Sequence, residues 1–481
     1  MSTIIKPGIE KDRAAEKALT EVVKRDLDLL NYPQRDWVIA RESSTGQKIL
    51  DVLIIGGGQS GLAAAFALKR DKVKNILVVD ESEHGKEGPW LTFARMHTLR
   101  TPKHLTGPDL GVPSLTVRNW YETVYGKATW DALTLIPKEH WADYLMWLRE
   151  TLEIPVRNLT QAGAIEWNER ERCFNIPLTD KASGKTEISL ARKVVLATGI
   201  DGMGRWDVPS MISSGLSKDL HYAHTRDEID FEKLKGKSIG VLGAGASAFD
   251  NASVALETGA REIHLFYRRE DLPNINPYRW AEFVGFLKHH GDLPDHMKWK
   301  FILQILKMGQ LPPTDTYARA TVNPNFHLHG GSSWTTVTPK DGKIEIGTPK
   351  GNFIVDYIIV GTGFVTDLSL RPELAGIVDK IALWKDRFAP PGEEVNEDLS
   401  RHPYLGSHCE FIEKNPGEAP YLSSIFCYTF GGLVSVGFGG ASISGMKFSS
   451  QRLVSGITKQ FYIEDAELYL DSLMKFDLTE F

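Results

Sequence analysis

The sequence predicts an α/β protein in which one unit, an apolar strand that runs through a glycine turn into a helix, occurs twice. The first copy is DVLIIGGGQSGLAAAFALKR, residues 51–70, and the second is SIGVLGAGASAFDNASVAL, residues 238–256. Two further strands, KVVLATGIDG at 193–202 and DYIIVGTGFVTD at 356–367, each end in a Thr-Gly turn. Strands that alternate with helices in this way are typical of parallel sheets covered by helices. We therefore expect two parallel-sheet units in one chain.

The composition narrows the class of partner. A chain of 481 residues with a net charge of -6 and no Lys/Arg cluster gives no footprint for nucleic acid or an anionic membrane surface. The charged N-terminus excludes a signal peptide, and no apolar run is long enough to span a bilayer. The three cysteines contain no C-x-x-C pair. We expect a soluble cytoplasmic protein that acts on small molecules.

The first glycine turn has the spacing of a phosphate cradle. Gly56 allows the tight turn, Gly58 lets the backbone approach a pyrophosphate, and Gly61 lets the helix pack closely on the strand. The next strand, NILVVD, ends at Asp80 and is followed by Glu81, where an acid can accept hydrogen bonds from ribose hydroxyls. The sequence therefore predicts an adenine dinucleotide site here.

The second turn selects a different nucleotide. Gly243, Gly245 and Ala248 repeat the spacing, but the next strand, REIHLFYRRE, runs into Arg268 and Arg269 instead of an acid. Paired guanidinium groups would bind a 2′-phosphate, which favours NADPH over NADH. The alternative is that the two arginines form a solvated charge pair at a strand end.

Two dinucleotide sites predict an electron path in which FAD stays bound at the first site and NADPH delivers hydride from the second. The turns at Thr198 with Gly199 and at Gly363 resemble the points where two-dinucleotide flavoproteins cross between domains. The resemblance implies an inserted NADPH-binding domain. The expected parts are a helical extension at 1–49, a discontinuous FAD-binding domain at 50–209 and 353–481, and an NADPH-binding domain at 210–352 with a helical cap at about 271–325.

Two segments carry a more specific resemblance. GKEGPW, which ends at Trp90, and TLRTPKHL, which contains Lys103, are similar to segments of the class B flavin monooxygenases. This group includes flavin-containing monooxygenases, Baeyer-Villiger enzymes and amine N-hydroxylases. The resemblance implies that Trp90 and Lys103 lie beside the flavin, as catalytic-pocket residues. The asparagine usual in flavin-containing monooxygenases is absent from the lysine segment. The F-x-G-x-x-x-H-x-x-x-W/D fingerprint of the group should precede the second glycine turn, but GLSKDLHYAHTRD keeps only the histidines His221 and His224. The sequence is therefore not assigned to a subgroup.

The resemblance implies a reaction. NADPH would reduce FAD, and O2 would then form a C4a-(hydro)peroxyflavin that oxygenates a small organic substrate, by N-hydroxylation or a Baeyer-Villiger reaction. One alternative is an NADPH oxidase or an electron-transfer reductase without a disulfide. Another is a redox-sensing protein that binds FAD and NADPH only as ligands.

The C-terminal part offers a second contact with the flavin. The loop GGLVSVGFGGASISG leads into a helix expected at about 446–461, whose N-terminus could face the flavin pyrimidine with Gly440, Ala441 and Ser442 closest. The partial positive charge of a helix N-terminus would stabilise the anionic reduced flavin. The alternative is that the helix only caps the FAD-binding domain.

The cap and the N-terminus complete the expectations. NPYR in the cap loosely resembles the Ser-Pro-Phe segment of amine N-hydroxylases, which makes Asn276 and Tyr278 candidates for substrate contact. Trp280, Phe283, Val284 and Leu287 have the helical spacing of a core face. Residues 7–30 are expected to form an amphipathic helix that packs on the body or on a second subunit of a homo-oligomer, with one apolar side made of Ala15, Leu19, Val22 and Leu30. The histidines have no company that would predict a metal site.

Overall fold

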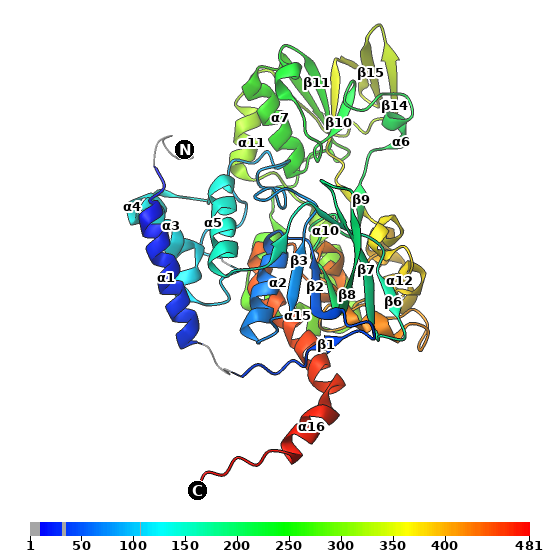
Figure 1. Cartoon of the computed structure of the whole chain (residues 1–481). Helices are drawn as coiled ribbons and strands as arrows, with labels where there is room; N and C mark the ends of the chain where they lie inside the picture. Colours follow the sequence, from blue (N-terminus) through cyan, green and yellow to red (C-terminus); the bar gives the residue numbers. More distant parts are fainter. Residues whose placement is uncertain (1–9, 31–34, 106) are drawn as a thin grey trace.

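The computed structural model describes residues 10–30, 35–105 and 107–481, and it contains two α/β bodies, one above the other in Figure 1. Each body is organised around its own mainly parallel sheet, with helices packed against it. Within the described part of the chain, no helix is both long and apolar enough to cross a membrane. The predicted α/β class with two parallel-sheet units is therefore present.

The lower body is built on a nine-stranded sheet with the order β4–β3–β2–β8–β7–β5. Its centre is parallel, and β1, β5, β6 and β7 pair antiparallel around it, while β19 joins in parallel beside β8. The strands are β1 (Arg41–Glu42), β2 (Lys48–Ile55), β3 (Ile76–Val79), β4 (Val156–Arg157), β5 (Thr160–Ala162), β6 (Glu166–Asn168), β7 (Cys173–Asp180), β8 (Thr186–Leu196) and β19 (Ile425–Cys427).

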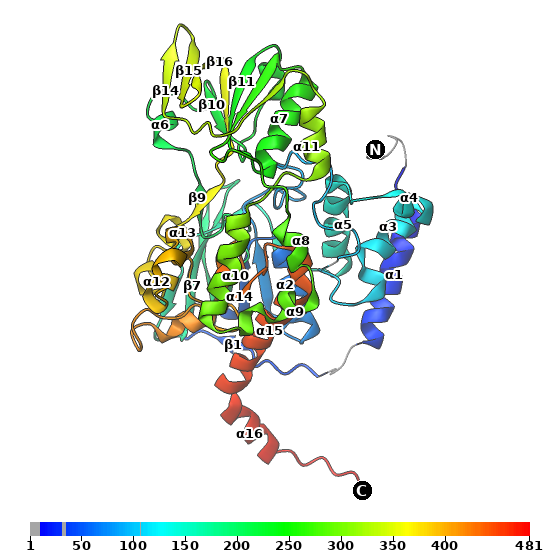
Figure 2. The same ribbon diagram turned by 180° about the vertical axis from the view of Figure 1, so that it is seen from behind.

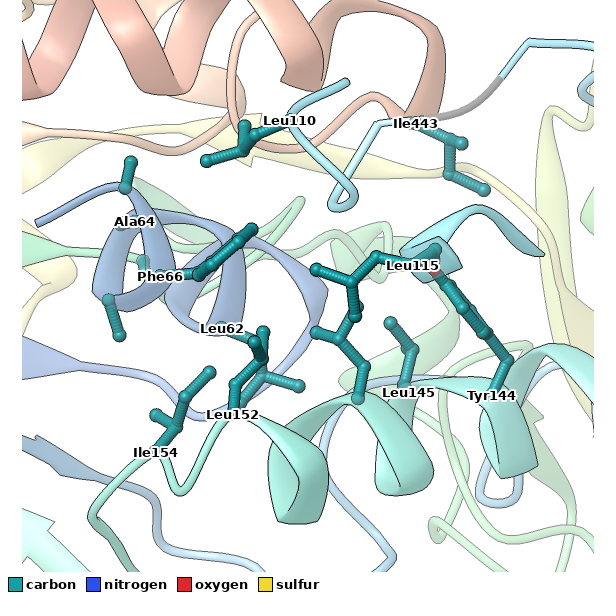
Figure 3. Close-up of a cluster of buried hydrophobic side chains, with 14 of the residues drawn as sticks. Leu62, Ala64, Phe66, Leu110, Leu115, Tyr144, Leu145, Leu152, Ile154 and Ile443 are labelled. Carbon is teal, nitrogen blue, oxygen red and sulfur yellow. The ribbon is translucent and has the colours of Figure 1, made fainter. Parts of the chain in front are cut away.

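Three helices share one hydrophobic core with the central strands of the lower body. They are α2 (Gln59–Arg70), α5 (Lys138–Thr151) and α15 (Ile443–Glu464). The alanine-rich sequence of α2 lets it pack deeply, so that all its residues from Ser60 to Leu68 are buried. Figure 3 shows Leu62 and Phe66 of α2 facing Leu145 and Leu152 from the α5 side. This packing fixes the N-terminus of α2 at the end of β2.

The upper body carries a five-stranded, fully parallel sheet with the order β10–β17–β11–β12–β13. Helices α7 and α11 pack together on one face, and a three-stranded antiparallel sheet lies beside it. The strands are β10 (Tyr222–His224), β11 (Ser238–Leu242), β12 (Glu262–Phe266), β13 (Phe326–His329), β14 (Thr336–Lys340), β15 (Lys343–Thr348), β16 (Gly351–Val355) and β17 (Tyr357–Val360); the helices are α7 (Ala246–Thr258) and α11 (Thr314–Thr321).

Two antiparallel linkers join the bodies. Strand β9 (Gly204–Trp206) leaves the lower body, and β18 (Phe364–Thr366) returns beside it. Because β17 pairs with β11 as far as Val360, the chain stays in the upper body beyond residue 352. The expected return at 353 is therefore too early, since the apolar run YIIV completes the upper sheet before the Thr-Gly turn.

The expected cap is helical, and most of it packs on the lower body. Its helices are α8 (Pro277–Ala281), α9 (Val284–His289) and α10 (Asp295–Met308), which share a core with α14 (Leu433–Val436). Figure 2 shows them beside α15. The expected core face is wrong in part. The helix is interrupted between α8 and α9, and the side chains of Trp280, Phe283 and Val284 are about half exposed or more.

The N-terminal helix α1 (Arg13–Leu29) packs against α3 (Val117–Tyr125) and α5. Its buried side chains are Leu19 and Val23, one turn apart, whereas Val22 is 49% exposed. The expected apolar face is therefore correct at Leu19, but the next buried position is Val23 and not Val22. Residues 7–9 of the expected helix lie outside the described residues. The remaining helices are α4 (Lys127–Ala132), α6 (Ser210–Ser213), α12 (Trp384–Arg387), α13 (Glu397–Ser400) and α16 (Ala466–Met474).

Candidate active site

A continuous cavity of about 2140 Å³ runs between the two bodies. It begins at the first glycine turn, passes the linkers, and reaches α8 and the loop before α15. A pocket of this kind at the carboxyl ends of parallel strands is where α/β proteins bind nucleotides. The predicted site residues that line it are Gly56, Gly58, Asp80, Glu81, Trp90, Thr198, Gly199, Asn276, Tyr278, Ala441 and Ser442.

The first glycine turn is shaped by close backbone contacts. Gly56 has φ +110°, and a Cβ there would collide with the carbonyl of Ala197, the residue that follows β8. A Cβ at Gly61 would collide with the carbonyl oxygen of Gly56. Gly58, in contrast, has no neighbour closer than 3.9 Å to an added Cβ, and it begins α2 without a side-chain cap. The first N–H groups of α2 are thus left for an anion in the cavity.

Asp80 holds this turn from the next strand. Its Oδ2 accepts a hydrogen bond of 2.7 Å from the backbone N–H of Gly57, and its Oδ1 accepts one of 2.8 Å from that of Ser82. The carboxylate keeps free lone pairs on the cavity side for a ribose hydroxyl. Glu81 is more exposed and lies 3.7 Å from the ammonium of Lys181.

Trp90 lines the cavity and contains an unpaired buried donor. The indole is 8% exposed, its Nε1 is buried without a partner among the described residues, and its ring meets Trp141 edge to face. A buried unpaired donor at a cavity wall is expected to bind a ligand acceptor. Lys103 points elsewhere: its Nζ donates to the carbonyl of Trp130 at 2.7 Å and lies 5.1 Å from that ring. Lys103 is not among the described residues that line the cavity.

The second glycine turn repeats the construction at the end of β11. A Cβ at Gly243 would collide with the carbonyl oxygen of Gly361, and Ala248 is buried against the same segment. Gly245 begins α7 without a side-chain cap, and an added Cβ there would meet nothing. Gly363 has φ +82° and accepts a hydrogen bond from the backbone of Asp207 at the linker crossing.

The two arginines that follow β12 have different environments. Arg269 donates to the carbonyls of Lys307 at 3.0 Å and Met308 at 3.3 Å, so it caps the C-terminus of α10. Arg268 is exposed at the strand end. Of the pair, Arg268 is therefore the more freely exposed guanidinium, while Arg269 binds the C-terminal carbonyls of α10.

An ion pair that sequence reasoning missed crosses the junction. Arg100, from the segment after Trp90, donates to the Asp250 carboxylate on α7 at 2.9 Å. Asp250 is 2% exposed and also accepts from the Thr316 hydroxyl at 3.0 Å. Arg100 and Asp250 both line the cavity. The available signal was the single acid among the small buried residues of GAGASAFDNASVAL.

Aromatic side chains form a wall where the linkers cross. Phe93, Trp206, Phe364 and Phe430 follow one another with ring centroids 6.0, 5.7 and 5.2 Å apart, and all four line the cavity. The guanidinium of Arg226, from the upper body, lies 4.0 Å from the ring of Phe93.

The loop before α15 lies beside the first glycine turn and lines the same cavity. The Ser60 hydroxyl at the start of α2 donates to the carbonyl of Gly440, which ties the loop to the first glycine turn. Ala441 and Ser442 line the cavity, and Ser442 begins α15 without a side-chain cap. The N-terminus of a 22-residue helix is thus directed at the cavity.

The cap supplies the opposite wall. The ring of Tyr278 stacks on Phe438 of this loop at 5.3 Å and 23°. Asn276 uses its Oδ1 to cap α8, where it accepts from the backbone N–H of Tyr278 at 3.0 Å, so its amide N–H groups remain available. Arg279 and Glu282 line the same region. Burial raises the pKa of the Glu282 carboxyl, against the opposing effects of Arg279 and His104.

Comparison with known proteins places this geometry in a family. Over 463 residues the chain is 41% identical to the FAD-dependent urate hydroxylase of Xanthomonas campestris pv. campestris, with 96% of each chain covered. The chain belongs to the family of this FAD-dependent hydroxylase. Residues 50–286 of this flavin monooxygenase match the family described as pyridine nucleotide-disulphide oxidoreductase. Its own three cysteines are buried and free.

Two solved structures share the fold of this flavin monooxygenase. One is the cadaverine monooxygenase DfoA of Erwinia amylovora bound to FAD, with a TM-score of 0.64, 15% identity, and coverage of 85% of this chain and 95% of that chain. The other is the ornithine N-hydroxylase KtzI of Kutzneria sp. 744, with a TM-score of 0.62, 13% identity, and coverage of 86% and 99%. They confirm the predicted fold class.

The protein is an FAD-dependent oxidoreductase, and the residues present fit that cofactor. The uncapped N-terminus of α2 offers N–H donors for a pyrophosphate, and the unpaired Trp90 Nε1 offers one more donor in the same cavity. The space at Gly58 is what a closely approaching phosphate requires.

Proposed function

We propose that this flavin monooxygenase hydroxylates urate with electrons from NADPH. The observation that carries the proposal is the 41% identity to a urate hydroxylase across nearly the whole of both chains. Identity of this extent spans both glycine turns, the linkers and the cap together. It favours urate over the amines named for the structurally similar hydroxylases, whose identities are 13–15%.

The proposed reaction balances with the predicted partners. NADPH gives two electrons, one atom of O2 becomes the hydroxyl group of the product, and the other atom leaves as water with two protons. FAD, when bound, supplies the chemistry that passes these electrons to O2. The chain itself binds and orients the reactants and keeps water away from them.

Residues of the upper body would hold the nicotinamide nucleotide. The uncapped N-terminus of α7 would receive its pyrophosphate, and Arg268 its 2′-phosphate. The similar structure of KtzI contains NADP+, which supports a nucleotide at this place. The pair formed by Arg100 and Asp250 would fix the upper body against the flavin-binding segment while hydride is transferred.

The wall made by the cap and the loop before α15 suits a planar anionic heterocycle. Tyr278 and Phe438 offer stacked aromatic surface, and Arg279 offers a positive charge. The Asn276 amide could donate to a ring carbonyl, and the Glu282 carboxylate could accept from a ring N–H. These groups match the alternating carbonyl and N–H edges of urate.

Substrate-dependent turnover tests the proposal. The purified, FAD-loaded chain should consume NADPH in step with urate, and labelled dioxygen should place one labelled oxygen atom in the product. Ornithine, lysine, cadaverine and simple ketones serve as comparison substrates. If urate leaves the rate of NADPH oxidation at its substrate-free level while an amine becomes hydroxylated, urate is not the substrate and N-hydroxylation replaces it.

A further inference from the structure

The last helix, α16, has no core contact of its own. None of its residues is buried, and Figures 1 and 2 both show α16 and the chain end standing away from the lower body. A nine-residue helix is only marginally stable when water surrounds it. Its exposed apolar side chains are therefore available to pack on a surface outside this copy of the chain.

The C-terminal arm, defined as residues 466–481, exposes an unusual number of apolar side chains. Burial of one such side chain would remove roughly 60–120 Å² of apolar surface from water, which is favourable. The set would bury several hundred Å², which approaches the ~800 Å² that each partner contributes to a stable interface. The large apolar residues of the arm that are more than half exposed are Leu468, Leu470, Leu473, Met474, Phe476, Leu478 and Phe481.

The root of the arm is rigid. The side chain of Asp465, immediately before α16, is fully buried and is bonded by Arg41 at 2.5 Å and by Arg192 at 3.0 Å. One turn later, the hydroxyl of Tyr469 donates to the carbonyl of Trp37 at 2.6 Å. A buried carboxylate held by two guanidinium groups fixes the direction in which α16 leaves the body. The arm is thus aimed outward.

The charges on the arm indicate its partner. It carries four acids and a single lysine, whereas helices that bind anionic membranes carry Lys and Arg on their polar face. The outward face of α1 has the complementary balance, with Val22 and Leu29 exposed among its charges. Its exposed basic residues are Arg13, Lys17, Lys24 and Arg25, against the exposed acids Glu21 and Asp28.

We propose that the arm of each copy packs on the outward face of α1 of a second copy, forming a dimer with twofold symmetry. Twofold symmetry uses both surfaces twice, so that two arms and two α1 helices are covered at once. Apolar burial supplies the affinity, and the opposite charges set the register. This interface lies away from the cavity, so it is independent of the proposed urate chemistry.

Sedimentation velocity on the FAD-loaded full chain tests the proposal. The wild type should be a dimer at micromolar concentration. Replacing both Leu470→Asp and Leu473→Asp should raise the dissociation constant roughly thirtyfold or more. Val395→Asp, at an apolar position that is 61% exposed elsewhere on the surface, is the matched control and should stay dimeric.

An exchange of charges between α1 and the arm provides a second test. Lys24→Glu with Arg25→Glu should weaken the dimer, and adding Glu467→Lys with Asp471→Lys should restore it. Flavin absorbance reports the folding of every variant, and NADPH consumption should not change. A monomeric wild type, a dimer that survives the two aspartates, or a monomer whose arm binds phosphatidylserine vesicles would each overturn the proposal.

Discussion

Arg100 and Asp250 form an ion pair of 2.9 Å across the junction between the two bodies, inside the cavity. Asp250 is almost fully buried, accepts a hydrogen bond from the Thr316 hydroxyl and also lies 3.6 Å from the Arg319 guanidinium of the same body. Without Arg100, Asp250 would keep Arg319 as a cation within the upper body but would lose its contact with the segment after Trp90. This pair therefore couples the position of the upper body to the segment beside the predicted flavin site.

Arg100→Gln should slow the reduction of the bound flavin by NADPH by about tenfold, which corresponds to ~1.4 kcal/mol of lost positioning. The FAD content should not change, because the first glycine turn is untouched. Anaerobic stopped-flow absorbance measures the rate. Arg118→Gln, which removes an exposed pair with Glu122 on α3, is the matched control. An unaltered reduction rate in Arg100→Gln would show that the pair does not position the nicotinamide.

Arg268→Ala should raise the KM for NADPH by roughly ten- to hundredfold, the value of lost charge-assisted hydrogen bonds of about 1.5–3 kcal/mol. The KM for NADH should change little, because NADH lacks the 2′-phosphate. Arg269→Ala should instead lower thermal stability and leave the coenzyme preference intact, since Arg269 caps α10. Steady-state kinetics with both coenzymes distinguish the two; equal effects on NADPH and NADH in Arg268→Ala would remove the 2′-phosphate assignment.

Much of the fold follows from local sequence signals. Around Gly56 and Gly243, a buried apolar strand is followed by glycines whose spacing indicates a tight turn into a helix. Both units form as expected. The helix before the chain end extends to Ile443–Glu464, longer than the expected 446–461, because small residues at its start still pack inside the protein.

Features that depend on contacts between distant segments were not predictable in the same way. Arg100 and Asp250 are 150 residues apart, and no motif around either residue indicates that the two form a pair. Arg269 resembles a phosphate ligand in sequence, but its neighbours are the last carbonyls of α10, which arrive from the cap. In α1, the side chain buried against the neighbouring helices is Val23 and not Val22, and this depends on where α3 and α5 lie.

Gly61→Ala should abolish FAD binding or folding of the lower body, because its Cβ would overlap the carbonyl oxygen of Gly56 and force α2 away from β2. Visible absorbance of the purified chain, with and without added FAD, measures the outcome. Gly376→Ala is the matched control, since an added Cβ there meets nothing within 4 Å. A yellow Gly61→Ala variant with normal stability would contradict the close approach of α2 to the turn.

Asp51→Asn should change how stability depends on pH. Burial raises the pKa of Asp51 from 3.8 to about 6, against the opposing charge of Arg192. Between these two values the folded chain keeps a proton that the unfolded chain releases. The free energy of unfolding therefore falls as pH rises through this window, by at most about 3 kcal/mol, and stays lower above it.

Asparagine cannot ionise, so the variant should match the wild type near pH 4 and exceed its stability above pH 6. Urea unfolding of the FAD-loaded proteins at a series of pH values measures the difference. Asp36→Asn, at an exposed pair with Lys74, is the control and should track the wild type throughout. If the difference between Asp51→Asn and the wild type is constant with pH, then Asp51 does not retain its proton in the folded protein across this window.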